Sequence, residues 1–218
     1  MIKLLSTKVL SFENRQKITN SSIKISDYNA INIEKIKINI DAKIKNAIFT
    51  SKNSVRAIIN KNIDIKNCYC VGEKTKSLLL KNGQKVVKCE ENALKLANFI
   101  VKSSKNDNFS FFCGNMKRDE LPRILKKNNI KFSIVEVYKT SFNYKKTDDN
   151  YSGILFFSPS AVKSYCHCNK IEDEVLFTIG QTTTNEAKTF TNKIITSDIN
   201  NIGQVVDNAI KYFTYDKK

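Results

Sequence analysis

The chain has 218 residues, of which 41% are hydrophobic, and its 37 Lys and Arg against 21 Asp and Glu give a formal net charge of +16. This composition is typical of a globular protein with one large domain or two small ones. Because it has no run of about 18 apolar residues and no leader peptide with a cleavage site, we expect neither a membrane span nor a secreted product, and place the protein in the cytoplasm.

The positive charge predicts an attraction to polyanions. Nucleic acid is the first such partner to consider, but the sequence has no helix-turn-helix, zinc-finger or RNP-type motif, and its lysines are scattered instead of clustered. Lysine, asparagine and isoleucine are all abundant, so a biased composition explains much of the charge. We therefore expect no nucleic-acid partner, and keep a nucleic-acid-binding protein as an alternative.

The chain begins with a predicted strand over residues 2–5, a weak helix over 13–18 and a second strand from residue 23. Between residues 24 and 45, isoleucines alternate with polar residues, which is typical of a long, half-buried strand. We expect this segment to connect two domains.

Residues 111–140 contain a strand, a loop, a helix and a second strand in direct succession. Three phenylalanines between 109 and 112 predict a buried strand, which Gly114 and Asn115 end, and residues 117–127 have helical spacing. The second strand carries Tyr138. Because the first N–H groups of a helix have no partner within it, such a corner favours a carboxylate or phosphate ligand.

An internal repeat relates the two halves of the chain. Several segments recur at a nearly constant offset of about 107 residues, which predicts two copies of one unit. The matching segments are 23–26 with 130–133, 49–51 with 156–158, and 71–75 with 179–183. Each copy alternates short strands with helices, the pattern of a parallel sheet covered on both faces.

We therefore predict an α/β protein with two doubly wound parallel-sheet domains. The first domain is discontinuous, because its amino-terminal strand and helix belong with the carboxy-terminal half. The predicted boundaries are 1–33 with 143–218 for the first domain, 34–142 for the second, and connecting strands at roughly 24–40 and 132–144.

Hydroxyl-bearing and glycine residues recur where a predicted strand ends and a helix begins. Each is also a common helix cap, but five such corners spread over both domains favour one polyanionic ligand bound between them. The candidate binding residues are Thr50, Ser51, Asn53, Gly72, Thr75, Gly114, Asn115, Lys117, Ser158, Ser160, Gly180, Thr182 and Thr183.

Few residues are suited to catalysis. The sequence lacks the P-loop and dinucleotide motifs, and the single histidine, His167, has no nucleophile elbow to accompany it. The sequence has two Cys-x-Cys pairs, Cys68 with Cys70 and Cys166 with Cys168, and the second pair flanks His167. The spacing of these pairs does not fit a structural zinc site. We expect no metal and free thiols. Tyr138 remains as a candidate acid, with a half-buried structural tyrosine as the alternative.

At these residues the sequence resembles the uroporphyrinogen-III synthase family over nearly its whole length. The resemblance rests on the order and spacing of FTSKNSV, CVGEKTKSLL, FFCGNMKRDELPRIL with VEVYKT, FFSPSAVKSY and TIGQTTTNEA. It implies two flavodoxin-like domains joined by a two-stranded antiparallel ladder. We expect a monomer.

The resemblance also implies an activity. Members of the family cyclise hydroxymethylbilane, a linear tetrapyrrole with eight carboxylates, to uroporphyrinogen III with loss of water and inversion of ring D. This reaction of haem biosynthesis uses no cofactor. Tyr138 takes the place of the tyrosine thought to assist departure of the hydroxyl group, and Thr75, Ser158 and Thr183 fall on positions that face the ligand.

Two departures from the family pattern concern the predicted corners. Gln181 stands where proline is frequent, which leaves a backbone N–H available, and Glu73 places an acid where carboxylates are expected to bind. A non-catalytic two-domain module that binds a polyanionic ligand is therefore kept as an alternative function.

Overall fold

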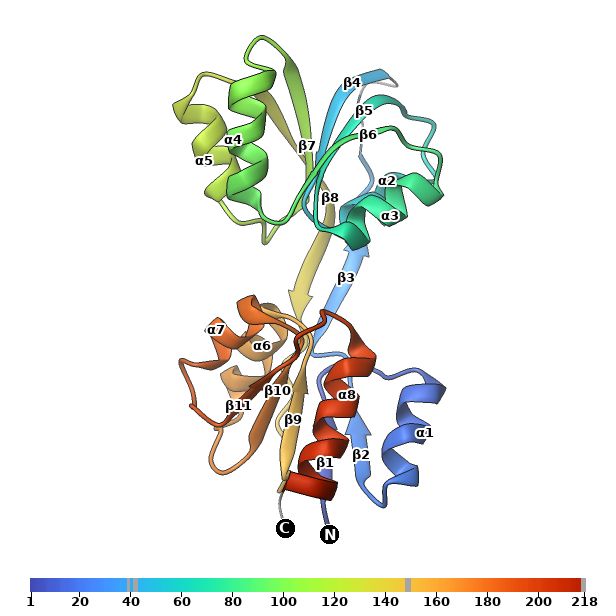
Figure 1. The fold of residues 1–218 in the computed structure, drawn as a ribbon, viewed down its shortest axis with the longest axis vertical. Coiled ribbons are helices and arrows are strands. Elements are labelled where there is room, and N and C mark those ends of the chain that lie inside the picture. Colours follow the sequence, from blue (N-terminus) through green and yellow to red (C-terminus); the bar gives the residue numbers. More distant parts are fainter. Residues whose placement is uncertain (39, 41–42, 148–149, 217–218) are drawn as a thin grey trace. The chain divides into compact units, whose positions relative to one another are not determined.

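The computed structural model describes residues 1–38, 40, 43–147 and 150–216. The chain forms two compact units, one of residues 1–32 with 141–218 and the other of residues 33–140. Each unit contains one β-sheet with helices on both faces (Figure 1). The fold is therefore α/β, with a discontinuous first unit, as the alternation of short strands and helices predicted.

The first unit contains five parallel strands in the spatial order β11-β10-β9-β1-β2. Numbered along this unit, the order is 2-1-3-4-5, the doubly wound order of flavodoxin. The strands are β1 (Lys3–Ser6), β2 (Lys24–Asp27), β9 (Gly153–Phe156), β10 (Val175–Thr178) and β11 (Ile194–Thr196).

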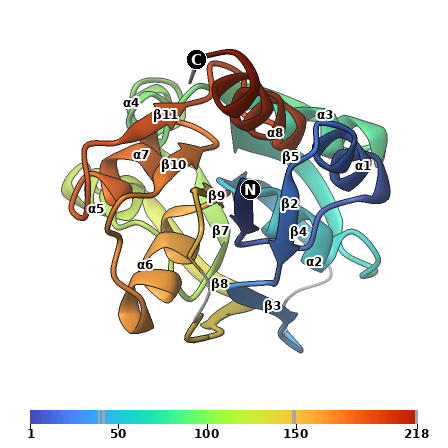
Figure 2. The ribbon, with the colours of Figure 1, turned by 90° about the horizontal axis from the view of Figure 1, so that it is seen from below.

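Helices cover both faces of this sheet (Figure 2). Leu4 packs with Ile18 and Val205 on the face of α1 and α8, whereas Leu5 packs with Val162 and Tyr165 on the face of α6. Neighbouring strand residues thus enter opposite cores, which explains the continuous apolar strand sequences. The helices are α1 (Phe12–Asn20), α6 (Pro159–Cys168), α7 (Gln181–Ala187), α8 (Ile202–Lys211) and a closing π-helix, η1 (Tyr212–Asp216).

The second unit contains a six-stranded sheet in the order β3-β8-β7-β4-β5-β6. Helices α4 and α5 cover one face and α2 and α3 the other, where the Phe49 and Phe112 rings stack at 5.3 Å. The strands are β3 (Ile31–Lys35), β4 (Lys43–Phe49), β5 (Asp64–Val71), β6 (Val86–Glu90), β7 (Asn108–Gly114) and β8 (Lys131–Phe142). The helices are α2 (Lys52–Ile58), α3 (Glu73–Lys81), α4 (Ala93–Ser103) and α5 (Glu120–Lys127).

The two sheets confirm the internal repeat. The order β2-β1-β9-β10-β11 in the first unit corresponds to β8-β7-β4-β5-β6 in the second. The strand-helix-strand segment that begins the first unit therefore ends the second, so the two units are circular permutations of one arrangement. The matching segments of the sequence lie on corresponding strands.

Strands β3 and β8 are neighbours and run through the two points at which the chain passes between units. The Ile36 N–H donates to the Val137 carbonyl at 3.0 Å and the Asn143 N–H to the Ala30 carbonyl at 2.9 Å. Residue numbers increase along one segment as those of the bonded residues decrease along the other, so the two segments are antiparallel.

The connecting strand predicted over 24–40 is wrong in its extent. It is interrupted after Asp27, so that β2 joins the first sheet and β3 the second. The interruption is held by side chains, because Asp27 Oδ2 accepts from the Leu10 N–H and Asn29 Oδ1 from the Val9 N–H, each at 3.1 Å. Position 39 of the predicted strand lies outside the described residues.

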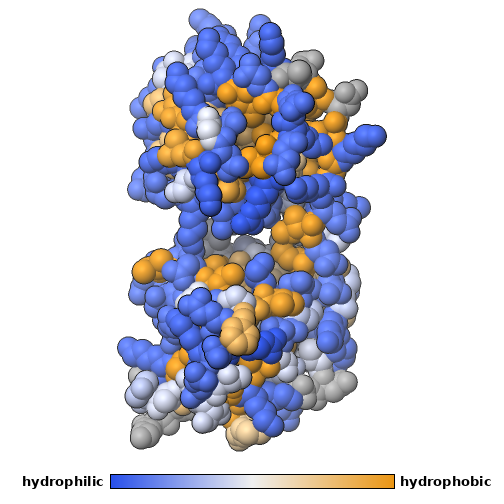
Figure 3. Space-filling view, turned by 90° about the vertical axis from the view of Figure 1, so that its right-hand side faces the viewer, coloured by the Kyte–Doolittle hydropathy of each residue, from blue (hydrophilic) through white to orange (hydrophobic). Residues whose placement is uncertain are grey.

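Hydrophilic residues cover most of the visible surface of each unit, with apolar patches between them (Figure 3). No helix in the described part of the chain is both long and apolar enough to cross a bilayer.

Candidate active site

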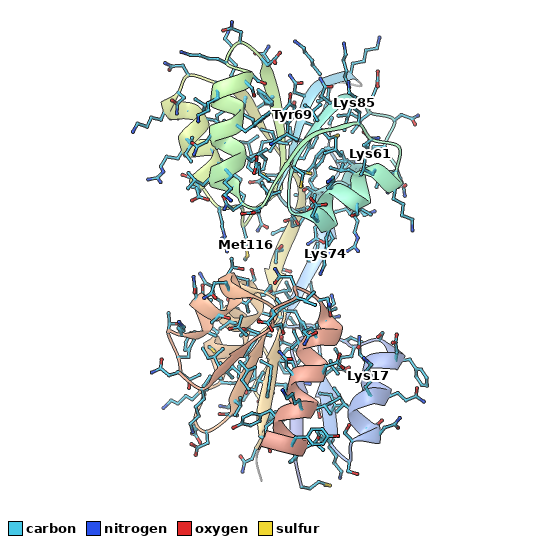
Figure 4. All side chains as sticks on the ribbon, in the orientation of Figure 1. Lys17, Lys61, Tyr69, Lys74, Lys85 and Met116 are labelled. Carbon is cyan, nitrogen blue, oxygen red and sulfur yellow. The ribbon has the colours of Figure 1, made fainter. Side chains whose placement is uncertain are left out.

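The predicted corner residues of the second unit follow the carboxyl ends of its strands. Ser51 comes after β4, Gly72 after β5, and Gly114 ends β7. Since these strands are parallel, their carboxyl ends meet at one edge of the sheet. Figure 4 shows Lys74 and Met116, which belong to two of these corners, at the same edge of the unit.

Tyr138 packs directly against Gly114 at this edge. The two residues are partners in the β7–β8 pairing, where the register shifts between Cys113 and Gly114. A Cβ atom on Gly114 would lie 2.4 Å from Tyr138 Cε2 and 2.5 Å from Cζ. Only glycine therefore leaves room for the tyrosine ring in this position.

The Ser51 side chain lies near enough to the Tyr138 hydroxyl to influence its ionisation. Burial of the half-buried ring raises the pKa of Tyr138 above its usual value, and the nearby Ser51 side chain opposes that rise. The phenol therefore keeps its proton at neutral pH. Ser51 also caps α2, because its Oγ accepts from the Asn53 N–H at 3.1 Å.

The Asn115 side chain is hydrogen bonded to β8 close to Tyr138. Its Oδ1 accepts from the Thr140 N–H at 2.8 Å and its Nδ2 donates to the Thr140 carbonyl at 3.1 Å. The side chain thus substitutes for a peptide group and extends the pairing of β8 past the end of β7. A role for the Asn115 side chain in holding Tyr138 follows from these bonds.

Lys117 forms an ion pair with Glu136, two residues before Tyr138, at 3.5 Å. The lysine side chain is only 21% exposed, against 43% for the glutamate. Its charge also acts on the Cys113 thiol, whose pKa burial raises to about 11. Sequence reasoning did not select Glu136 as a site residue, although its position near Tyr138 and Lys117 was a usable signal. The helix predicted from residue 117 begins at Glu120, after a turn.

Two corresponding helices, α3 and α7, begin after Gly72 and Gly180, and neither has a side-chain cap. In both, the third residue is a buried threonine, Thr75 or Thr183, whose N–H donates to the carbonyl of that glycine at 2.9 Å. Gly72 has φ of 83°, which favours glycine. The repeated geometry leaves N–H groups of both first turns uncapped by any described side chain.

Glu73, the acid expected to disturb the corner at Gly72, takes part in an ion pair. Glu73 forms an ion pair with Lys76 at 3.2 Å, and its side chain is 75% exposed. Its charge is therefore partly balanced and directed to solvent.

The other predicted residues lie in the expected corners. Ser158 caps α6, since its Oγ accepts from the Ala161 N–H at 3.1 Å. The half-buried candidates are Thr50, Ser51, Asn53, Gly72, Lys117, Tyr138, Ser158 and Ser160; the buried ones are Thr75, Gly114, Gly180 and Thr183; and the exposed ones are Asn115 and Thr182.

A hydroxyl network under α7 was not predicted. Thr184 Oγ1 lies 2.6 Å from Thr178 Oγ1 and 2.7 Å from Thr196 Oγ1, so one helical residue joins two neighbouring strands. Repeated threonines at 182–184 were the only signal in the sequence, and they did not distinguish Thr184 from its neighbours.

All six cysteines are free. Within the described ranges, no group of three or more His, Cys, Asp and Glu residues is arranged to hold a metal ion. The His167 ring stacks on Tyr144 with centroids 4.2 Å apart. These observations assign a packing contact to His167.

Comparison with known proteins places the chain in a family. The family model described as uroporphyrinogen-III synthase HemD matches residues 16–207. Among solved structures, the uroporphyrinogen-III synthetase of Helicobacter pylori is 16% identical, with a TM-score of 0.70 and coverage of 97% of this chain and 99% of that one. A mutant uroporphyrinogen III synthase of Thermus thermophilus is 8% identical, with a TM-score of 0.72 and coverage of 100% of both chains. At these identities the structures establish a shared fold.

Proposed function

The chain belongs to the uroporphyrinogen-III synthase family of cyclising lyases in tetrapyrrole biosynthesis, and we propose that it converts hydroxymethylbilane to uroporphyrinogen III. The reaction removes water from the hydroxymethyl group on ring A and closes the macrocycle with inversion of ring D. The family match over residues 16–207 is the observation that carries the proposal. The corner formed by Ser51, Gly114 and Tyr138 supplies a chemical basis for it.

Tyr138 assists the loss of water in this proposal. The carbon–oxygen bond of the hydroxymethyl group breaks more readily when its oxygen receives a hydrogen bond or proton as it leaves. A phenol that keeps its proton at neutral pH is suited to that task. Gly114 leaves the space that the ring occupies, and the Ser51 side chain lies near its hydroxyl.

In this proposal, polar residues at the strand ends of each unit supply hydrogen-bond donors for the substrate carboxylates. The uncapped N–H groups at the starts of α3 and α7, with the nearby Thr75 and Thr183, offer donors that match carboxylate oxygens. The net charge of +16 speeds capture of a polyanion. Once bound, the linear substrate is oriented so that ring D is attacked at its substituted position.

The reaction requires no redox cofactor, since loss of water and ring closure leave the overall oxidation state of the substrate unchanged. We propose that the protein acts as a monomer in the cytoplasm, where thiols such as its free cysteines are reduced unless an oxidant is present.

A turnover assay tests the proposal against the non-catalytic alternative. Freshly made hydroxymethylbilane is incubated with the purified protein, and its consumption is compared with that in buffer. An enzyme consumes substrate in molar excess over protein. Binding without faster consumption supports the polyanion-binding module, and salt-sensitive retention on DNA with no turnover supports a nucleic-acid-binding protein.

A further inference from the structure

Two cysteines of the second unit are direct cross-strand neighbours. Cys70 on β5 and Cys89 on β6 are partners in the parallel pairing, so their side chains lie on the same face of the sheet. Both pack on the face covered by α3. Cys70 is fully buried, whereas Cys89 is half-buried on the edge strand of the sheet.

The first unit holds a different pair at the corresponding place. Thr178 and Thr196 are partners between β10 and β11, as Cys70 and Cys89 are between β5 and β6. The two threonines are joined through the hydroxyl of Thr184. Lys76 takes the place of Thr184 in the second unit, and it forms an ion pair with Glu73 instead. Hydroxyls therefore link the two strands in the first unit, whereas the second unit has a cross-strand pair of thiols at the corresponding positions.

We propose that Cys70 and Cys89 are a redox modification site, at which a hydroperoxide converts the two thiols to a disulfide between β5 and β6. In-register residues of adjacent strands are about 4.8 Å apart, within the Cα separation of about 4.4–6.8 Å that disulfides span. The bond adjoins the corner at Gly72, whose N–H donates to the Glu90 carbonyl at 2.8 Å.

The chemistry takes two steps. The more accessible Cys89 sulfur attacks the peroxide and becomes a sulfenic acid, which releases one water or alcohol. The Cys70 sulfur then displaces the hydroxyl of the sulfenic acid, and its proton leaves with that hydroxyl as water. The peroxide is reduced by two electrons and the thiol pair is oxidised by two. Burial raises the pKa of Cys70 and so disfavours its thiolate, which leaves the more exposed Cys89 as the thiol that reacts with the peroxide first.

Cys68 is the internal comparison. It lies two residues before Cys70 on the same strand, but its partner on β6 is Val86 and its thiol approaches Gln84 Oε1 at 3.9 Å. It is also fully buried. Cys68 is therefore expected to remain a thiol under conditions that oxidise Cys89.

Peptide mapping of the folded protein after treatment with hydrogen peroxide tests the site. Unreacted thiols are blocked with an alkylating agent that is present during denaturation, and after digestion the linked cysteines are assigned by fragmentation of the peptides in the mass spectrometer. We expect a peptide pair joined through Cys70 and Cys89, which dithiothreitol separates. Because the readout is the mass of the peptides, its outcome is independent of turnover.

The first unit supplies a matched control variant. Cys70→Thr with Cys89→Thr places in the second unit the residues that stand at the corresponding positions of the first. This variant should fold, resist cross-linking and keep Cys68 reduced. A second control, Cys68→Ser, should form the link as the unaltered protein does. Overoxidation of Cys89 without a link, a link through Cys68, or no reaction at either thiol would each overturn the proposal.

Discussion

Replacing Gly114 with alanine tests whether the position of the Tyr138 ring matters for turnover. The new Cβ would lie 2.4 Å from Tyr138 Cε2, 2.5 Å from Cζ and 2.9 Å from the hydroxyl oxygen. Carbon atoms attract one another at about 3.5–4.0 Å, so the ring must retreat by roughly 1 Å. The Gly114 backbone is outside the left-handed region, so alanine adds no strain there. The perturbation is therefore confined to the tyrosine ring and the residues beside it.

The expected loss of activity follows from that displacement. A misplacement of about 1 Å in a reacting group costs on the order of 100-fold in rate, or about 2.7 kcal/mol of transition-state stabilisation. Because Tyr138 is half-buried, the ring can move toward solvent, and the cost in folding stability should stay within about 1–3 kcal/mol. We expect kcat to fall by roughly 100-fold and KM to change little.

Steady-state kinetics with hydroxymethylbilane measure this effect. Gly203→Ala in α8 is the matched control, because its Cβ meets only the Asn201 and Asn14 side-chain oxygens, at 3.3 Å and 3.8 Å, and kcat should be unchanged. In a Tyr138→Ala background the ring is absent, so Gly114→Ala should add at most about twofold. An equal loss in both backgrounds, or a wild-type kcat for Gly114→Ala, would refute the role given to this glycine.

Four further predictions concern the corner and the cores. Tyr138→Phe should lower kcat by about 100-fold with an unchanged melting temperature; an unchanged kcat removes the acid role. Because burial raises the pKa of Tyr138, the protonated form persists beyond the pH at which a free tyrosine ionises, so wild-type kcat should show no loss due to Tyr138 until above pH ~10. A loss of kcat below pH ~9 that disappears in Tyr138→Phe would contradict a raised pKa of Tyr138. Thr75→Val and Thr183→Val should each raise KM by about 5- to 10-fold with kcat retained, whereas unchanged KM in both excludes those hydroxyls from binding. Phe177→Ala, at a fully buried ring, should cost about 3–5 kcal/mol in urea unfolding, and a cost below about 1 kcal/mol would contradict its place in the core.

The fold class and the internal repeat were predictable because they depend on local patterns. Strands that are buried on both faces appear in the sequence as continuous runs of apolar residues, and glycine or hydroxyl residues mark the ends of these runs. The repeat then related β5 to β10 and β4 to β9 and indicated which end of the chain completes the first unit. The structure bears out this arrangement in the strand order of the two sheets.

The details that were not predicted depend on contacts between distant residues. The interruption after β2 rests on Asp27 and Asn29 accepting from amides about 20 positions away, which no local pattern reveals. Asn115 was selected for its place between a strand and a helix, and only the structure shows that its side-chain amide is bonded to Thr140. Gly114 was expected as a strand break, whereas its contact with Tyr138 depends on the β7–β8 register.

The ratio of product isomers tests the proposed activity most directly. Hydroxymethylbilane closes without an enzyme to the uninverted isomer I, so the identity of the product distinguishes catalysis from spontaneous closure. After incubation with the protein and oxidation to the porphyrins, the isomers are separated by chromatography. We predict that isomer III dominates and that Tyr138→Phe shifts the mixture toward isomer I. Isomer I alone, formed at the rate seen in buffer, would contradict the proposal.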